Sequence, residues 1–282
     1  MATYPASEQL LVIIDPVARR TDGESVRIAK DVLSAGAATK LCLPNGPEEF
    51  ARALARRGSR RPVVVGDDRA LVRAVSLLHR QRELAGSVLS VVPVGSTLSL
   101  ARSLGVPTGA VAAARAVLDG DVRRLDVLVD DSDGVVLRAV GIPPVREGAA
   151  PGAGAEPADG RPWLRTCQSL VRTLVPLRPA RTLTAPEPAR LRVEVDGATV
   201  VDLDQPVEAV SLTPGAAGSA LVEVRPVSAG AEAPPVRAEG RTVSVSGGDF
   251  RYRADAQVVG PVRRRTWTVA EGALGVTLPT PV

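Results

Sequence analysis

Hydrophobic and polar positions divide the chain into two patterns. Up to residue 125, short apolar runs alternate with stretches whose apolar residues recur at helical spacing. A short apolar run bounded by turn residues is typical of a strand buried on both faces, so the alternation predicts a parallel sheet covered by helices. The expected strands are 11–14, 39–43, 62–65 and 88–92, and the expected helices are 22–35, 47–57, 70–84, 98–104 and 108–118.

After residue 125 helical spacing gives way to short β segments. Asp196-Gly197 lies between two alternating runs and predicts a tight hairpin. Many short strands at regular spacing indicate an antiparallel sandwich or a barrel-like structure. The expected strands are 125–129, 135–140, 191–195, 199–203, 207–212, 221–224, 242–245, 250–254, 266–269 and 275–278.

The predicted fold class is therefore α/β plus β in two domains. Residues 1–128 would form a parallel-sheet, Rossmann-like domain of the nucleotide-binding kind, and residues 129–282 an antiparallel β-sandwich domain. The chain of 282 residues is long enough for both. Residues 147–160 are almost wholly Gly, Ala, Pro and acidic, which predicts a mobile loop.

Composition narrows the possible partners. The net charge is +4, and nearly all the basic residues are arginine. No aromatic residues are interleaved with them for base stacking, so we expect no nucleic-acid partner. The dense basic run Arg263-Arg264-Arg265 fits either a solvated turn or strand end, or a contact with phosphate or an anionic lipid membrane surface. Cys42 and Cys167 have no metal-ligand spacing and fit a reduced cytoplasm, with peripheral membrane contact as the alternative location.

Three strand-to-helix turns are the places where chemistry is expected. In an open parallel sheet, ligands bind beyond the carboxyl ends of the strands, where backbone N–H groups at helix N-termini can hold a phosphate. The turns have neither a dinucleotide glycine fingerprint nor a P-loop. They lie at residues 15–19, 66–69 and 93–97.

These turns resemble the motifs of the diacylglycerol kinase and lipid kinase family, to which sphingosine kinase and NAD kinase are related. That family has N-P-x-S-G, G-G-D-G-T and P-x-G-T-x-N-D-F-A-R-x-L-G-I-P after its first, third and fourth strands. This chain has D-P-V-A-R at 15–19, V-G-D-D-R at 65–69 and P-V-G-S-T-L-S-L-A-R-S-L-G-V-P at 93–107. The third stretch is the most specific, because these residues match in register: Pro93, Gly95, Ala101, Arg102, Leu104, Gly105 and Pro107.

The resemblance implies ATP and Mg²⁺ bound between two domains, with phosphoryl transfer to a lipid hydroxyl. It makes Asp67 the surviving catalytic or metal-linked carboxylate, and it matches Asp255-Ala256-Gln257 with the family's late D-G-E. Leu125-Asp126 matches the family's I-D, where Asp126 could be a turn residue or a metal ligand. The implied nucleotide-binding positions are Asp15, Gly66, Asp68, Arg69, Gly95, Ser96 and Thr97, and no metal ligand is assigned.

Several of these positions depart from the family pattern. Asp15 replaces an asparagine, Val65 and Asp68 replace glycines, and Leu98-Ser99 replaces Asn-Asp. Glycines let the backbone approach a phosphate, whereas a carboxylate about 4 Å from a phosphate charge costs about 4 kcal/mol at an effective dielectric near 20. Two functions remain open: an ATP-dependent lipid kinase with weak or altered activity, and a non-catalytic pseudokinase that binds or scaffolds. The departures favour the second, and Asp67 and Asp68 would then simply cap a helix.

Overall fold

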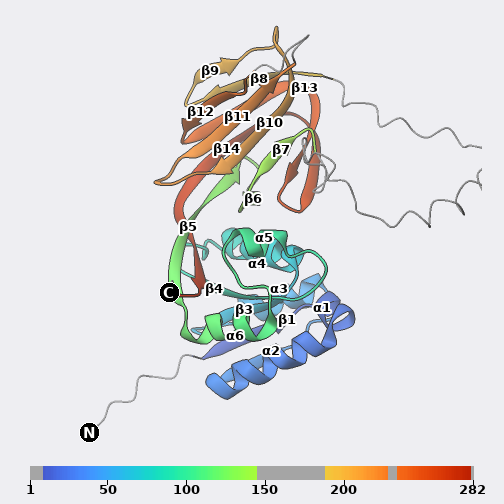
Figure 1. Ribbon diagram of the computed structural model, residues 1–282, viewed down its shortest axis with the longest axis vertical. Coiled ribbons are helices and arrows are strands. Elements are labelled where there is room, and N and C mark those ends of the chain that lie inside the picture. Colours follow the sequence, from blue (N-terminus) through green and yellow to red (C-terminus); the bar gives the residue numbers. More distant parts are fainter. Residues whose placement is uncertain (1–8, 145–187, 228–233, 281–282) are drawn as a thin grey trace, which may run out of the picture.

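The computed structural model describes residues 9–144, 188–227 and 234–280. An α/β part and a β-rich part are stacked along the long axis of the molecule (Figure 1). The glycine- and alanine-rich segment 147–160, predicted to be a mobile loop, lies outside the described residues.

The first four strands form the sheet of the α/β part. They are β1 (Leu10–Ile14), β2 (Thr39–Cys42), β3 (Arg61–Gly66) and β4 (Val88–Pro93). Their order is β4-β3-β1-β2, and each neighbouring pair is parallel. β1, β3 and β4 are almost wholly buried because their apolar residues face helices on both sides.

Helices cover both faces of this sheet. α2 (Gly23–Gly36) and α6 (Ala110–Asp119) pack on one face, and α3 (Pro47–Ala55), α4 (Asp68–Arg80) and α5 (Ser99–Ser103) pack on the other. The short helix α1 (Pro16–Thr21) was not predicted. It begins where a proline follows a capping aspartate, which favours a helix start.

The second half of the chain is built from strands that pair antiparallel with one another. A ring of pairings joins β10, β7, β13 and β8 around a core that contains Tyr252 and Trp267. Together with β1–β4, all the strands belong to one connected sheet, whereas a sandwich was expected. The strands are β5 (Asp121–Asp130), β6 (Val135–Val136), β7 (Val140–Ile142), β8 (Ala189–Val195), β9 (Ala198–Val201), β10 (Pro206–Pro214), β11 (Ala220–Pro226), β12 (Val236–Gly240), β13 (Thr242–Ala254) and β14 (Gln257–Leu278).

Some predicted strands are pieces of longer ones. Segments 242–245 and 250–254 both lie in β13, and 266–269 and 275–278 both lie in β14. Irregularities in the pairing interrupt the alternation that marks a strand, between Ser246 and Phe250 and between Ala270 and Leu274. The predicted hairpin is confirmed, since Asp196 and Gly197 both have positive φ between β8 and β9.

The end of β14 returns to the α/β part. Gly275 and Val276 pair in parallel with β4, and Leu278 is buried in the core on the α4 face. Thr277 accepts a hydrogen bond of 3.1 Å from Arg61 and shares one of 2.9 Å with Ser90. The last strand, predicted as part of the second domain, therefore ties the two parts together.

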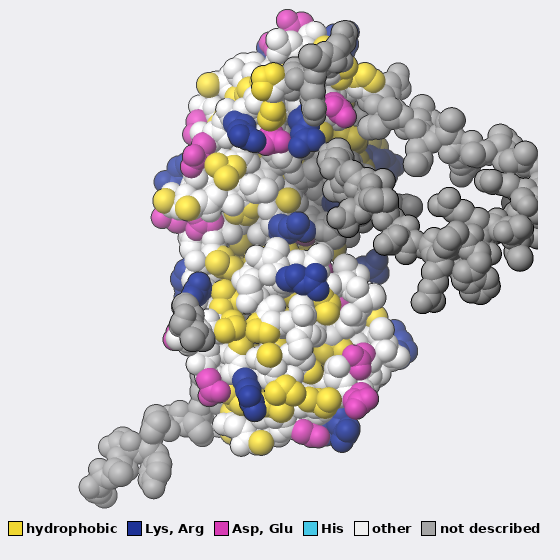
Figure 2. All heavy atoms as spheres, viewed as in Figure 1, with side chains coloured by type: hydrophobic (Ala, Val, Ile, Leu, Met, Phe, Trp, Pro, Cys, Tyr) yellow, Lys and Arg dark blue, Asp and Glu magenta, His cyan; other side chains and the backbone are white. Residues whose placement is uncertain are grey.

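The basic run 263–265 lies inside β14, so the predicted turn or strand end is wrong. Arg263 pairs with Asp249 at 2.8 Å, and Arg265 forms an ion pair with Asp131. Across the face in Figure 2, basic and acidic side chains are interspersed over both parts. The net positive charge is therefore not gathered into a single basic patch on this face.

None of the helices in the described residues has the length and apolar character needed to cross a bilayer.

Candidate functional site: the carboxyl edge of the parallel sheet and the adjoining cleft

The three motif turns meet at the carboxyl edge of the parallel sheet, as their positions predicted. The backbone N–H of Asp15 donates to Val65 at 2.9 Å, and that of Val94 donates to Gly66 at 2.9 Å. The N–H of Asp68 donates to the carbonyl of Thr97 at 2.9 Å. These bonds hold the three turns against one another.

Asp15 is 3% exposed and has both carboxylate oxygens occupied. One oxygen accepts from the N–H of Val17 at 2.8 Å, which caps α1. The other accepts from Arg73 of α4 at 2.8 Å. The negative charge that replaces the family's asparagine is thus neutralised within the protein.

Asp67, the predicted catalytic carboxylate, is the N-cap of α4. One of its oxygens accepts from the N–H groups of Arg69 and Ala70, each at 3.1 Å. The neighbouring glycine Gly95 has φ 135°, and a Cβ there would lie 3.1 Å from the Cβ of Asp67. A Cβ at Gly66 would lie 2.6 Å from that of Ala70, so both motif glycines are needed for packing alone.

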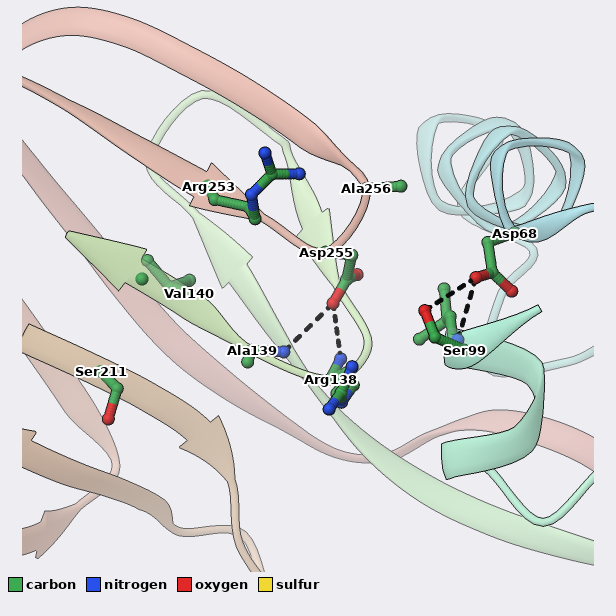
Figure 3. A pocket seen from close by; sticks show the side chains of 11 residues that line it. Asp68, Ser99, Arg138, Ala139, Val140, Ser211, Arg253, Asp255 and Ala256 are labelled. Atoms are coloured by element: carbon green, nitrogen blue, oxygen red, sulfur yellow. Dashed lines mark hydrogen bonds between the residues drawn. The ribbon is translucent and has the colours of Figure 1, made fainter. Parts of the chain in front are cut away.

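Asp68 is 1% exposed and reaches from α4 to the start of α5. Its carboxylate accepts from the N–H groups of Leu100 at 2.9 Å and Ala101 at 3.1 Å, and from the hydroxyl of Ser99 at 3.2 Å. Figure 3 shows the Asp68 carboxylate turned toward Ser99. The first N–H groups of α5 therefore have a carboxylate of the protein itself as their partner.

The other predicted phosphate contacts are less engaged. The side chains of Arg69 and Ser96 are exposed, and Thr97 is half-buried. The structure brings all these positions to one edge of the sheet, as predicted, but only Asp68 also lines the adjoining cavity.

That cavity lies between the two parts of the molecule and measures about 230 Å³. Asp68, Ser99 and Leu100 line it from the α/β part, and segments of β7, β10 and β13 line it from the other side. Figure 3 shows Asp255 and Asp68 on opposite sides of the cavity, each with its carboxylate turned toward its own hydrogen-bond partners, and Arg138 and Arg253 on the side of Asp255. The lining residues of the β-rich part are Arg138, Ala139, Val140, Gly141, Ser211, Arg253, Asp255 and Ala256.

Asp255 lies in the turn between β13 and β14, with a positive φ of 47°. Its carboxylate accepts from the N–H groups of Leu137 at 2.7 Å, Arg138 at 2.8 Å and Ala139 at 3.1 Å. Burial raises the pKa of Asp255, although these three hydrogen bonds act against the rise. The residue matched with the family's late aspartate thus holds the connection between β6 and β7.

Asp126 lies within β5 and not in a turn, so the predicted turn role is wrong. It accepts from the N–H of Gly218 at 2.8 Å and from that of Gly272 at 2.7 Å, joining the β10–β11 turn to β14. Within the described ranges, no three His, Cys, Asp or Glu residues gather closely enough to hold a metal ion.

Sequence reasoning missed the arginines of the cavity. Arg138 and Arg253 lie more than a hundred residues apart in the chain, and both line the cavity because β7 and β13 pair. The one signal that could have indicated this region was the match of Asp255 with the family's D-G-E.

The architecture is an α/β part joined to a β-rich part, with a cavity between them. Residues 9–129 match the model of the diacylglycerol kinase catalytic domain. This match confirms the resemblance seen in the motifs over that part of the chain.

Solved structures show the same fold over the whole chain. A diacylglycerol kinase from Bacillus anthracis str. Sterne has 13% identity and a TM-score of 0.69, with 98% of each chain covered. Two further structures from that organism, provisionally assigned as a diacylglycerol kinase, have 14% identity, TM-scores of 0.71 and 0.70, and the same coverage. No curated protein matches the chain.

Proposed function

We propose that this chain is a lipid kinase-like protein in which ATP-dependent phosphoryl transfer is weak or lost, and that it acts as a non-catalytic binding protein. The observation that carries the proposal is the position of the Asp68 carboxylate. It lies buried at the start of α5, where the family's motif has a glycine that leaves the site open.

The charge of Asp68 works against a bound phosphate. A carboxylate about 4 Å from a phosphate charge costs about 4 kcal/mol at an effective dielectric near 20, which is roughly a thousandfold in affinity. The carboxylate is held in this position by the N–H groups of Leu100 and Ala101, at 2.9 and 3.1 Å. One exposed arginine, Arg69, would return only about 1.5–3 kcal/mol through a hydrogen bond to the phosphate.

The family comparison suggests that a carboxylate has changed places. The family's motif has an aspartate at the position of Ser99 and a glycine at the position of Asp68. In this chain the carboxylate comes from α4 instead and bonds to the Ser99 hydroxyl at 3.2 Å. The start of α5 keeps its anionic partner, but the loop before α4 loses the space that glycine provided.

The residues present do not fit ATP and Mg²⁺ in the manner that the resemblance implies. Asp15 is neutralised by Arg73, and Asp67 is engaged as a helix cap. Asp68 and Asp255 each accept from backbone N–H groups. Phosphoryl transfer depends on positioning of the phosphate groups and on neutralisation of their charge, so these departures should weaken both.

A binding role is supported by the cavity that remains. It combines the apolar residues Leu100 and Val140 with Arg138 and Arg253. Asp68 and Asp255 line the same cavity and balance the two arginine charges, so a small ligand with an apolar body and an uncharged polar head has the complementary chemistry.

Thermal unfolding with and without millimolar ATP–Mg²⁺ tests the proposal. The midpoint of the natural protein should not change, since a ligand that binds the native state raises it. The double variant Asp68→Gly/Ser99→Asp, which restores both family residues, should gain an ATP-dependent shift. Asp68→Asn removes the charge but keeps the bulk of the side chain, so it distinguishes repulsion by the charge from loss of space.

An upward shift in the natural protein that is lost in Asp67→Ala would overturn the proposal in favour of a working nucleotide site. A parallel assay follows labelled phosphate from ATP to diacylglycerol in mixed micelles. The natural protein should form no product above the protein-free blank, and clear turnover would likewise refute a non-catalytic role.

A further inference from the structure

A second concave surface lies far from the cleft, between the edge strand β2 and helix α3. It has a volume of about 320 Å³ and an apolar floor of Leu11, Cys42 and Ala53. Its rim carries Lys40, Arg52, Arg56 and Glu49. We call these seven residues the β2–α3 groove.

The rim of the β2–α3 groove has an excess of positive charge. In the described part of the chain, Lys40, Arg52 and Arg56 form no ion pair. The single acid, Glu49, accepts from the backbone N–H of Asn45 at 2.9 Å. Three cations therefore face one carboxylate that is already engaged, which favours an acidic partner.

The groove runs beside an open sheet edge. Among the described strands β2 pairs only with β1, so its outer N–H and C=O groups have no strand partner. Side chains alternate along a strand. Lys40 and Cys42 point toward the β2–α3 groove. Leu41 pairs with Val12, which belongs to the core on the α2 side of the sheet, so it points to that side, and it is 42% exposed.

We propose that β2 and the β2–α3 groove bind an extended acidic peptide segment of a partner protein, which adds as a strand to the open edge. Its acidic side chains lie against Lys40, Arg52 and Arg56, and its apolar side chains, one position out of phase, cover Leu41. The recognised chemistry is thus a segment in which acidic and aliphatic residues alternate. This site does not depend on the state of the interdomain cleft.

A second copy of the chain fits the edge poorly. Pairing of two β2 edges about a twofold axis would bring the same three cations from each copy together, with only Glu49 of each copy to balance them. A membrane surface satisfies the cations but leaves the edge N–H and C=O groups without strand partners.

Fluorescence anisotropy with a short dye-labelled peptide of alternating Glu and Val tests the proposal on the full chain. We expect saturable binding that weakens with salt, and about tenfold or more loss of affinity in Arg52→Glu/Arg56→Glu. The matched control is Arg27→Glu/Arg115→Glu, which makes the same charge change at exposed positions of α2 and α6 and should bind normally. Thermal midpoints verify that both variants fold.

Cys42 provides an independent readout at the floor of the groove. It is a half-buried free thiol, and the bound ligand peptide should slow its alkylation. The extent of alkylation is measured by mass spectrometry of the proteolytic fragment that contains Cys42. A scrambled peptide with the same residues but no alternation should bind about tenfold more weakly and should not protect Cys42.

Four results would overturn the proposal. The first two are that the scrambled peptide binds equally well, and that the two double variants lose binding equally. The third is that phosphatidylglycerol vesicles protect Cys42 but the peptide does not. The fourth is that the protein self-associates as its concentration rises and that this protects Cys42 without peptide. The last two results would identify a membrane or a second copy as the occupant.

Discussion

The two parts of the molecule use aspartate in different ways. In the α/β part, Asp15 and Asp67 cap helices that begin at the next residue, and they accept from backbone N–H groups two or three residues further along the chain. In the β-rich part, Asp255 bonds to backbone 116 to 118 residues away, and Asp126 to backbone 92 and 146 residues away. The same side chain therefore organises local structure in one part and joins distant segments in the other.

Among these contacts with backbone N–H groups, Asp68 is the exception that links the difference to function. It lies in the α/β part, yet its partners are 31 to 33 residues away, at the start of α5. A carboxylate that serves as a long-range structural contact is not available to a ligand. The comparison therefore shows why an acidic residue within a family motif need not take part in the family's chemistry.

The sharpest test of the division into two parts is the loss of an aromatic core residue from each. Phe50 in the α/β part and Trp267 in the β-rich part are fully buried, and Trp267 stacks edge-on against Tyr252. Phe50→Ala and Trp267→Ala should each lower the free energy of unfolding by about 3–5 kcal/mol. Because β14 runs through both parts, urea unfolding followed by circular dichroism should keep one transition in both variants. Two separate transitions would show that the parts unfold independently.

A smaller effect should separate two carboxylates of the β-rich part by their pH dependence. Burial raises the pKa of Asp255 above its ordinary value. The stability that comes from the protonated Asp255 carboxyl is therefore fully present when the pH is below the ordinary pKa, and it is lost as pH rises through the raised pKa. Burial also acts to raise the pKa of Asp130, but hydrogen bonds from Ser132 and Gly134 outweigh it and lower the pKa overall. The contribution of Asp130 is therefore present above the ordinary value and is lost as pH falls through the lowered pKa.

Unfolding by urea at a series of acidic pH values measures this contrast. The difference in unfolding free energy between the natural protein and Asp255→Asn should decrease as pH rises. The difference from Asp130→Asn should increase over the same direction. Removal of either carboxylate should itself cost about 1–3 kcal/mol through backbone N–H groups left without partners. Equal slopes for the two variants would contradict the assignment.

The smallest expected effect is spectroscopic. Burial raises the pKa of Tyr252 to about 12. The nearby charge of Asp130 adds to this rise, and the charge of Arg265 acts against it. The chain has two tyrosines, and an alkaline absorbance titration should show one that ionises well above the usual range. That step should vanish in Tyr252→Phe. Stability tied to the Tyr252 proton is complete below its ordinary pKa of 10.0 and is lost as pH rises through about 12.

The sequence by itself determined the local elements and their order. Apolar runs such as 11–14 mark strands, and Asp22, Pro47 and Asp196-Gly197 mark helix starts and a hairpin, because these signals act over a few residues. The motif turns also indicated the correct edge of the sheet. That edge follows from chain direction in a parallel sheet and requires no knowledge of side-chain contacts.

Only the tertiary structure decided what the motif residues do. Whether Asp68 faces a ligand or the N–H groups of α5 depends on how two loops pack, and the return of β14 to pair with β4 depends on a contact between segments more than 180 residues apart. The arginines of the cavity come together for the same reason. Contacts of this kind are set by the burial of surfaces that are distant in the chain, which leaves no periodic signal in the sequence.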